Sequence, residues 1–179
     1  MRLLVPDQII TSVLQIDLQE LKRRNIKGLL IDLDNTLVDW GKSEMEPVFA
    51  QWIKKVREAG LRVCLVSNAM PERVDYFAEE LGVPGVSKAL KPLGRAFRRG
   101  IKALDLKPNE VAVIGDQLFT DVYGGNRLGL HTILINPLST QELRTTRLVR
   151  RLERRMMRKM VKRGLINQAA LRTRERRRH

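Results

Sequence analysis

Short apolar runs alternate with helical patterns along most of this chain, and this alternation constrains its fold more than any other feature. The runs cover residues 29–33, 61–66, 111–114 and 130–135, with a shorter extended piece at 83–87. Apolar residues recur at helical spacing in three other segments: after Pro47, from Pro71 to Leu81, and at Phe97, Ile101 and Leu104. A further short helix is expected at 120–128. Strands and helices of these lengths indicate βαβ units. The sequence therefore predicts an α/β fold with a mostly parallel sheet covered by helices on both faces.

Other features of the sequence limit the class of protein and the compartment in which it is expected. The entry segment, Asp7 to Arg24, has apolar residues at mixed helical spacing, and we expect it to cover one side of the core. A single cysteine, Cys64, lies inside an apolar run, which predicts a buried thiol and excludes a disulfide within the chain. The first residues lack the apolar core of a signal peptide, and no apolar run approaches the ~18 residues of a membrane span. We therefore expect a protein of the reducing cytoplasm.

Polar residues follow the apolar runs at the points where the predicted strands end. They are Asp32 and Asp34 after the first strand, Ser67 and Asn68 after the second, Lys91 after the short extended piece, and Asp116 and Asp121 after the run at 111–114. Parallel sheets bind ligands beyond the carboxyl ends of their strands. We therefore expect these side chains to meet at one edge of the sheet.

Asp32 and Asp34 are the first two residues of this set in the sequence. Two carboxylates held close together repel, and a hard cation such as Mg²⁺ relieves the repulsion while leaving one carboxylate able to attack an electrophile. An ordinary turn at the end of a strand explains the pair equally well when it is taken alone. Asp116 could likewise be a helix cap. Their joint occurrence after successive strands favours phosphoryl transfer, with Asp32 as nucleophile and metal ligand, Asp34 as the acid that protonates the departing alkoxide, and Asp116 completing the metal site.

The other polar residues complete a phosphate site. Ser67, Asn68 and the backbone amides of their turn would hold phosphate oxygens, and Lys91 would neutralise the charge that develops on the phosphoryl group. Asp121 lies five residues beyond Asp116 and is better placed to steady Lys91 or a water on the metal than to bind the ion directly.

These residues carry a resemblance to a known superfamily. The segments 32–37, 67–68, 91–92 and 115–121 resemble the four motifs of the haloacid dehalogenase superfamily of Mg²⁺-dependent phosphatases. From Leu14 to Pro137 the chain resembles, more narrowly, the YqeG family of subclass IIIA, which is related to the mitochondrial phosphatidylglycerophosphate phosphatase. The resemblance implies a Rossmann-like three-layer sandwich, an aspartyl-phosphate on Asp32, acid/base work by Asp34, and Mg²⁺ held by Asp32, the backbone carbonyl of Asp34, and Asp116.

The chain has little room for a cap domain over the site. The connector from Val38 to Glu46 is short, and only 23 residues lie between Ser67 and Lys91, where a helix and a strand are already expected. We therefore predict an open site. Such a site suits a phosphate displayed on something large, such as a lipid headgroup, a protein or the end of a nucleic acid.

The positive charge of the chain is concentrated in its last part. Residues 1–143 hold 19 Lys and Arg against 18 Asp and Glu, whereas residues 144–179 hold 15 against 2. Apolar residues recur there at helical spacing among the cations: Leu148, Val149, Leu152, Met156, Met160 and Val161. We expect a phosphatase domain over 1–140, and a basic amphipathic helix followed by a disordered tail over 141–179. Such a helix favours an anionic membrane surface or a partner, unless its apolar stripe docks on the core and leaves the cations in solvent.

Taken together, these features predict a cytoplasmic Mg²⁺-dependent phosphomonoester hydrolase, peripheral on the inner face of the membrane. The resemblance implies that its substrate is phosphatidylglycerophosphate, which it would convert to phosphatidylglycerol. The alternatives are a phosphatase of another macromolecular or small phosphomonoester, and a non-enzymatic protein that binds RNA or the ribosome through its tail. Clustered cations bind any polyanion. The tail has no Phe, Tyr or Trp, so it lacks both stacking platforms for single strands and the aromatic anchors of many interfacial helices.

Overall fold

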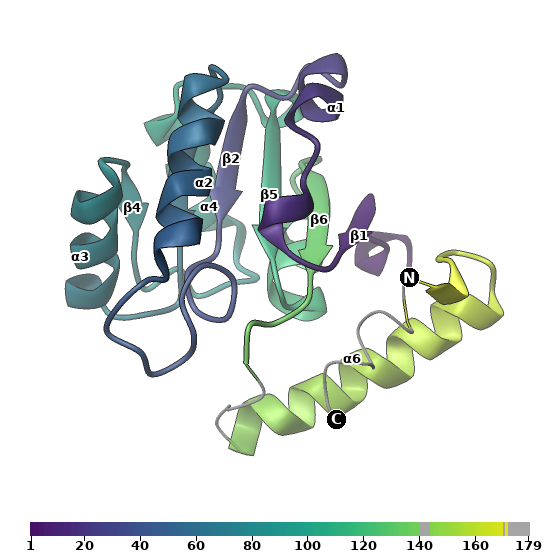
Figure 1. The fold of residues 1–179 in the computed structure, drawn as a ribbon. Helices are drawn as coiled ribbons and strands as arrows, with labels where there is room; N and C mark the ends of the chain where they lie inside the picture. Colours follow the sequence, from purple (N-terminus) through teal and green to yellow (C-terminus); the bar gives the residue numbers. More distant parts are fainter. Residues whose placement is uncertain (140–143, 170, 172–179) are drawn as a thin grey trace.

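A six-stranded parallel sheet forms the centre of the molecule in the computed structural model, which describes residues 1–139, 144–169 and 171 (Figure 1). The strands are β1 (Gln8–Ile10), β2 (Gly28–Ile31), β3 (Arg62–Val66), β4 (Gly85–Val86), β5 (Val111–Gly115) and β6 (His131–Ile135). Their order across the sheet is β1-β6-β5-β2-β3-β4, and each neighbouring pair is parallel. The predicted α/β fold with a parallel sheet is confirmed.

Helices cover both faces of the sheet and make three layers (Figure 1). One face carries α1 (Leu18–Arg23), α2 (Pro47–Glu58) and α3 (Pro71–Leu81), and the other carries α4 (Gly94–Ala103) and α5 (Tyr123–Asn126). Successive side chains of a strand point to opposite faces, so Leu29 and Ile31 pack under α2 and α3 whereas Leu30 packs under α4. Cys64 is buried on β3, as predicted, and burial raises the pKa of its thiol to about 12.

Two segments differ from the sequence-based expectation. The entry segment contains the edge strand β1, a 3₁₀ turn η2 (Val13–Gln15) and the short helix α1, so that part of it extends the sheet beside β6. A three-residue strand is too short to show an alternating pattern. The helix expected at 120–128 is divided into a π-helical turn, η4 (Leu118–Val122), and α5. Two further 3₁₀ turns, η1 (Arg2–Leu4) and η3 (Pro108–Glu110), complete the order of elements.

The basic helix α6 (Arg144–Lys162) lies along the edge of the sheet where the strands end (Figure 1). Met157 and Met160 are buried in a cluster with Leu118, Val122 and Leu134. The buried stripe also contains two charged residues, Arg150 and Glu153, whereas the expected apolar positions Leu148 and Leu152 are 60% and 51% exposed. The expected disorder at 172–179 and the boundary near 140 lie outside the described residues. Among the described helices, none has the length and apolar character needed to cross a membrane.

Candidate active site

A cavity of about 340 Å³ opens at the carboxyl ends of the central strands. Five of the seven residues predicted from the strand ends line it, and they are Asp32, Asp34, Ser67, Asn68 and Lys91. The other two, Asp116 and Asp121, are buried next to it with 0% and 1% exposure. Trp40, Gln117 and Thr120 contribute further to the lining. The structure thus brings all the predicted side chains to one edge of the sheet, although they come from four segments that follow β2, β3, β4 and β5.

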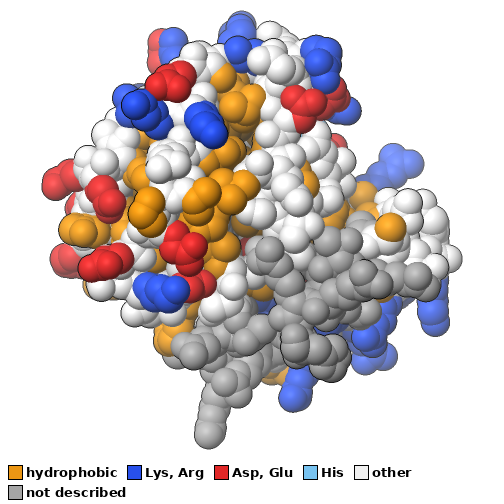
Figure 2. Space-filling view, viewed as in Figure 1, with side chains coloured by type: hydrophobic (Ala, Val, Ile, Leu, Met, Phe, Trp, Pro, Cys, Tyr) orange, Lys and Arg blue, Asp and Glu red, His pale blue; other side chains and the backbone are white. Residues whose placement is uncertain are grey.

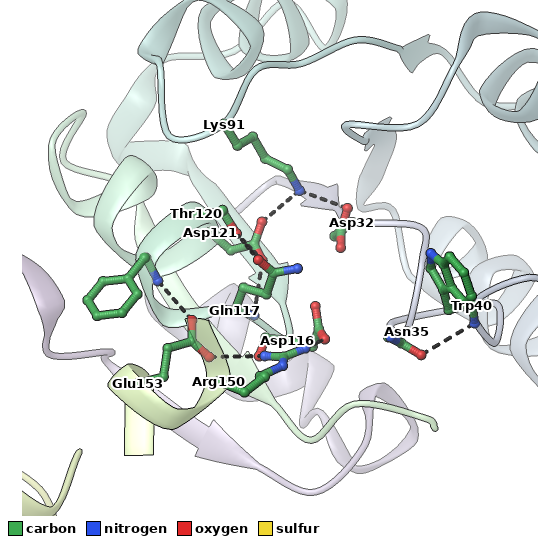
Figure 3. Close-up of polar contacts among 11 residues, drawn as sticks. Asp32, Asn35, Trp40, Lys91, Asp116, Gln117, Thr120, Asp121, Arg150 and Glu153 are labelled. Carbon is green, nitrogen blue, oxygen red and sulfur yellow. Dashed lines mark hydrogen bonds and ion pairs between the residues drawn. The ribbon is translucent and has the colours of Figure 1, made fainter. Parts of the chain in front are cut away.

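Lys91 links two of the acids (Figure 3). Its Nζ lies 2.7 Å from Oδ1 of Asp32 and 2.7 Å from Oδ1 of Asp121, and all three side chains are buried. Burial alone would lower the pKa of the ammonium group, but the adjacent carboxylates of Asp121 and Asp32 outweigh that effect and raise it. Lys91 therefore stays protonated and holds one oxygen of Asp32 in a fixed orientation.

Three acids are close enough to share a cation. Carboxylate oxygens of Asp32, Asp116 and Asp121 all lie within 4.8 Å of one another. Burial raises the pKa of Asp32 to about 8, and the charges of Asp121 and Asp116 act in the same direction while Lys91 opposes them. A crowded, buried set of carboxylate oxygens is the donor set that a hard divalent cation prefers, and the cation would favour the ionised form of Asp32. The residues therefore fit a divalent metal.

The π-helical turn η4 places Asp121 in this cluster. While Oδ1 of Asp121 contacts Lys91, its Oδ2 accepts hydrogen bonds from the backbone N–H of Gln117 (3.2 Å) and the hydroxyl of Thr120 (3.3 Å). π-helical turns occur mostly as single turns and often at functional sites. The sequence predicts that Asp121 steadies Lys91 or a water on the metal. In the structure Asp121 contacts Lys91 and also lies beside the carboxylates of Asp32 and Asp116.

Asp34 is held by a residue that the sequence analysis missed. The side chain of Arg73, on α3, donates from Nε to Oδ1 of Asp34 (2.9 Å) and from Nη1 to the carbonyl of Lys42 (2.6 Å). Asn35, with φ of +62°, makes the tight turn that follows, and its backbone N–H donates to Val38 (2.7 Å). Asp34 is a quarter exposed and lines the cavity, so it can reach a bound substrate while Arg73 fixes its orientation.

The loop after β3 organises the loop that carries Lys91. Oγ of Ser67 accepts a hydrogen bond from the backbone N–H of Ala69 (3.2 Å), and Oδ1 of Asn68 accepts one from the backbone N–H of Lys91 (2.9 Å). Ser67 is 1% exposed. The two residues predicted to bind phosphate therefore lie at the cavity wall, and Asn68 also holds Lys91 in place.

Helix α6 contributes two more residues that were not predicted. The guanidinium of Arg150 contacts both the carbonyl and the carboxylate of Asp116, and Glu153 accepts a hydrogen bond from the backbone N–H of Phe119 (3.1 Å) (Figure 3). One sequence signal could have pointed to them. Glu153 is the single acidic residue between positions 144 and 174, three residues after Arg150 on the same predicted helix.

Family models and known proteins match most of the described chain. A family model of haloacid dehalogenase-like hydrolases matches residues 42–129, and one of mitochondrial PGP phosphatases matches residues 1–82. The chain is 43% identical over 162 residues to the probable phosphatase YqeG of Bacillus subtilis (strain 168), which covers 90% of this chain and 94% of that protein. It is 28% identical over 171 residues to phosphatidylglycerophosphate phosphatase 1, chloroplastic/mitochondrial, of Arabidopsis thaliana, covering 90% of this chain and 49% of that protein.

Solved structures share the fold. The cobalt-bound form of the deoxy-D-mannose-octulosonate 8-phosphate phosphatase from Haemophilus influenzae superposes with a TM-score of 0.51 at 19% identity, over 64% of this chain and 70% of that one. An uncharacterized protein from Listeria monocytogenes serotype 4b gives a TM-score of 0.53 at 18% identity, over 66% and 85% of the two chains. At these identities the likeness extends to the fold alone.

Proposed function

Because this chain belongs to the YqeG family of haloacid dehalogenase-like phosphatases, we propose that it hydrolyses a phosphomonoester through an aspartyl-phosphate on Asp32. The observation that carries this proposal is the buried contact of Asp32 with Lys91 at the wall of the cavity, next to Asp116 and Asp121. Lys91 fixes one oxygen of Asp32 and adds positive charge where the phosphoryl group would bind.

The reaction proceeds in two displacements. A carboxylate oxygen of Asp32 attacks phosphorus, the bond from phosphorus to the alcohol oxygen breaks, and Asp34 gives its proton to that departing oxygen. A water molecule then attacks the same phosphorus, Asp34 takes the proton of the water, and the bond to Asp32 breaks to release phosphate. Arg73 keeps Asp34 oriented through both steps.

A divalent cation, Mg²⁺ in this proposal, would be held by Asp32, Asp116 and the backbone carbonyl of Asp34. Asp121 adds a buried carboxylate to the cluster but is engaged by Lys91. When bound, the cation screens the negative charges of the nucleophile and the phosphoryl oxygens from each other. The side chains of Ser67 and Asn68 would contribute further contacts to those oxygens from the cavity wall.

The proposed substrate is the lipid phosphatidylglycerophosphate, which the enzyme would reach from the inner, cytoplasmic face of the membrane. The name of the Arabidopsis relative supports this choice. The segment between Ser67 and Lys91 is filled by α3 and β4, so that no inserted domain covers the cavity there. Exposed apolar side chains stand on the loops next to the cavity: Trp40 (40%), Met70 (56%), Leu90 (69%) and Leu93 (55%). Such side chains suit contact with the apolar part of a bilayer.

The outer face of α6 supports the same proposal. Leu148 and Leu152, one helical turn apart, are exposed together with Arg151 and Arg155. Apolar and cationic side chains side by side are typical of helices that lie on anionic membranes. Figure 2 shows Lys and Arg gathered around the region of α6 at the lower right, whereas both signs of charge are mixed over the helices above.

Phosphate release from a panel of phosphomonoesters tests the proposal. The panel contains an aryl phosphate, small sugar phosphates and phosphatidylglycerophosphate in anionic vesicles, each with Mg²⁺ and with EDTA. We expect hydrolysis that needs the metal, favours the lipid and disappears in Asp32→Asn. If wild type and Asp32→Asn were equally inactive with every substrate in the presence of Mg²⁺, the proposed enzymatic activity would be rejected, and binding of RNA through the tail would be the remaining hypothesis. Preference for another phosphomonoester would retain the reaction and reject the lipid.

A further inference from the structure

Helix α6 docks on the domain through a buried pair of charges. Arg150 and Glu153 are 4% and 3% exposed, and Nη1 of Arg150 lies 3.1 Å from Oε2 of Glu153. Burying an ion pair costs free energy that a well-packed apolar pair would not cost. The helix already has apolar contacts at Met157 and Met160, so docking by itself does not require the charges.

The pair contacts both ends of the short segment from Asp116 to Phe119, which includes the start of η4. Nη1 of Arg150 donates to the carbonyl oxygen of Asp116 (2.5 Å), and Nη2 contacts the carboxylate of the same residue. One turn along α6, Oε1 of Glu153 accepts from the backbone N–H of Phe119 (3.1 Å). A planar guanidinium that binds two acceptors of one residue fixes both its backbone and its side chain. This segment, which leads from β5 into η4, is thereby held on the side that faces α6.

We propose that Arg150 and Glu153 are positioning residues that set the carboxylate of Asp116 for the divalent cation, which makes α6 part of the active site. This inference rests on the metal site proposed above. Hydrogen-bonded partners of a metal ligand orient it and raise metal affinity. Arg150 alone would repel a cation bound to Asp116, but the negative charge of Glu153 balances it. The pair thus supplies orientation with no net charge.

Calorimetric titration of the full-length protein with Mg²⁺ alone tests this inference. The main variant is Arg150→Met with Glu153→Gln, which removes the guanidinium, keeps an acceptor for the N–H of Phe119, and leaves the net charge of the pair at zero. We expect the Kd for Mg²⁺ to rise by about tenfold. The variant Asp116→Asn shows how far the Kd rises when a proposed metal ligand itself is removed. The substitution Lys159→Gln changes an exposed cation of the same helix and should leave the Kd unchanged.

The single variant Glu153→Gln gives a second measurement. It keeps the contact with Phe119 but leaves the charge of Arg150 unbalanced. It should therefore also weaken Mg²⁺ binding. This variant provides the test if the double variant does not fold. Thermal unfolding checks folding of each protein. An unchanged Kd in the folded variants would overturn the proposal, and a lower Kd would show instead that Arg150 competes with the cation. If the wild type bound no Mg²⁺, both this inference and the proposed metal site would fail.

Discussion

Arg73, a residue outside the recognised sequence pattern, orients the proposed catalytic acid Asp34. Its guanidinium holds Asp34 from α3 and also binds the connector through the carbonyl of Lys42. Arg73→Met should therefore leave Asp34 present but misdirected. Poor leaving groups would depend most on the proton that Asp34 is proposed to donate. Their kcat should therefore fall by up to about 10²-fold, whereas activated aryl phosphates should lose much less. Steady-state kinetics across a series of leaving groups measures this difference.

Two variants serve as references for that experiment. Asp34→Asn should show the same dependence on the leaving group with a larger loss, because it removes the proton itself. Arg73→Lys keeps the charge but not the planar fork, so it should recover part of the activity. An equal loss with good and poor leaving groups in Arg73→Met would mean that Arg73 does not act through Asp34.

At the residue scale, the predictable part of the site is the part that secondary structure dictates. Asp32 and Lys91 are 59 positions apart, yet they meet because the carboxyl ends of parallel strands share one edge. Arg73 and Arg150 reach the site from helices, and their contacts depend on how far each helix is rotated and where it docks. Periodicity does not contain that information. In the sequence Arg150 is one more cation on a cationic helix, and its burial follows from tertiary packing with Asp116 and Glu153.

At the scale of elements, the junction between β5 and η4 depends on Gly115. A Cβ atom added there would lie 2.2 Å from Cγ of Asp121, which is itself held by Lys91. Gly115→Ala should therefore displace η4, lower the free energy of unfolding by about 1–3 kcal/mol, and weaken Mg²⁺ binding. Urea unfolding and calorimetric titration measure the two effects.

Gly94→Ala is the matched control for this substitution. The new Cβ would lie 3.3 Å from the mobile end of the Arg98 side chain, at the first residue of α4, where alanine has the higher helix propensity. Its free energy of unfolding should equal or exceed that of the wild type. Wild-type stability and Mg²⁺ affinity in Gly115→Ala would refute the role given to this contact.

The predicted elements differ in how much local sequence determines them. The bounds of α3 follow from Pro71 at its first position and Gly82, with φ of +61°, at its end, and both are local signals. The edge strand β1 has three residues, and it forms because β6 offers it a partner. The π-helical turn η4 likewise forms around Asp121, which combines local contacts with Gln117 and Thr120 and an ion pair with Lys91 from a distant loop.

At the scale of the whole molecule, α6 lies along the edge of the sheet where the strands end (Figure 1), which is also the edge where the cavity lined by Asp32 and Lys91 opens. Exposed cations of α6 such as Arg151 and Arg155 therefore stand on the same edge of the molecule as the cavity where a phosphate would bind. Removing everything after Ser139 would test a membrane role poorly, because it would also delete Arg150 and Glu153. Substitutions on the exposed face of α6 leave those contacts intact.

The variant Arg151→Gln with Arg155→Gln removes two exposed cations of α6. Each cation near an anionic leaflet contributes about 1 kcal/mol, so affinity for anionic vesicles should fall roughly 30-fold and hydrolysis of vesicle-borne phosphatidylglycerophosphate should fall with it. Hydrolysis of a soluble aryl phosphate should stay at the wild-type rate. Vesicle sedimentation and phosphate release measure the two quantities, and added salt should weaken the binding of the wild type in the same way.

The control removes the same charge from another helix. Lys54→Gln with Lys55→Gln, on the exposed face of α2, should leave vesicle binding and lipid hydrolysis unchanged, because that face does not border the cavity. If the α6 variant kept full activity on vesicles but lost affinity for RNA, the tail would be a nucleic-acid arm. If both variants lost vesicle affinity equally, net charge alone would attract the protein to the bilayer, and α6 would have no special part in presenting the cavity to its substrate.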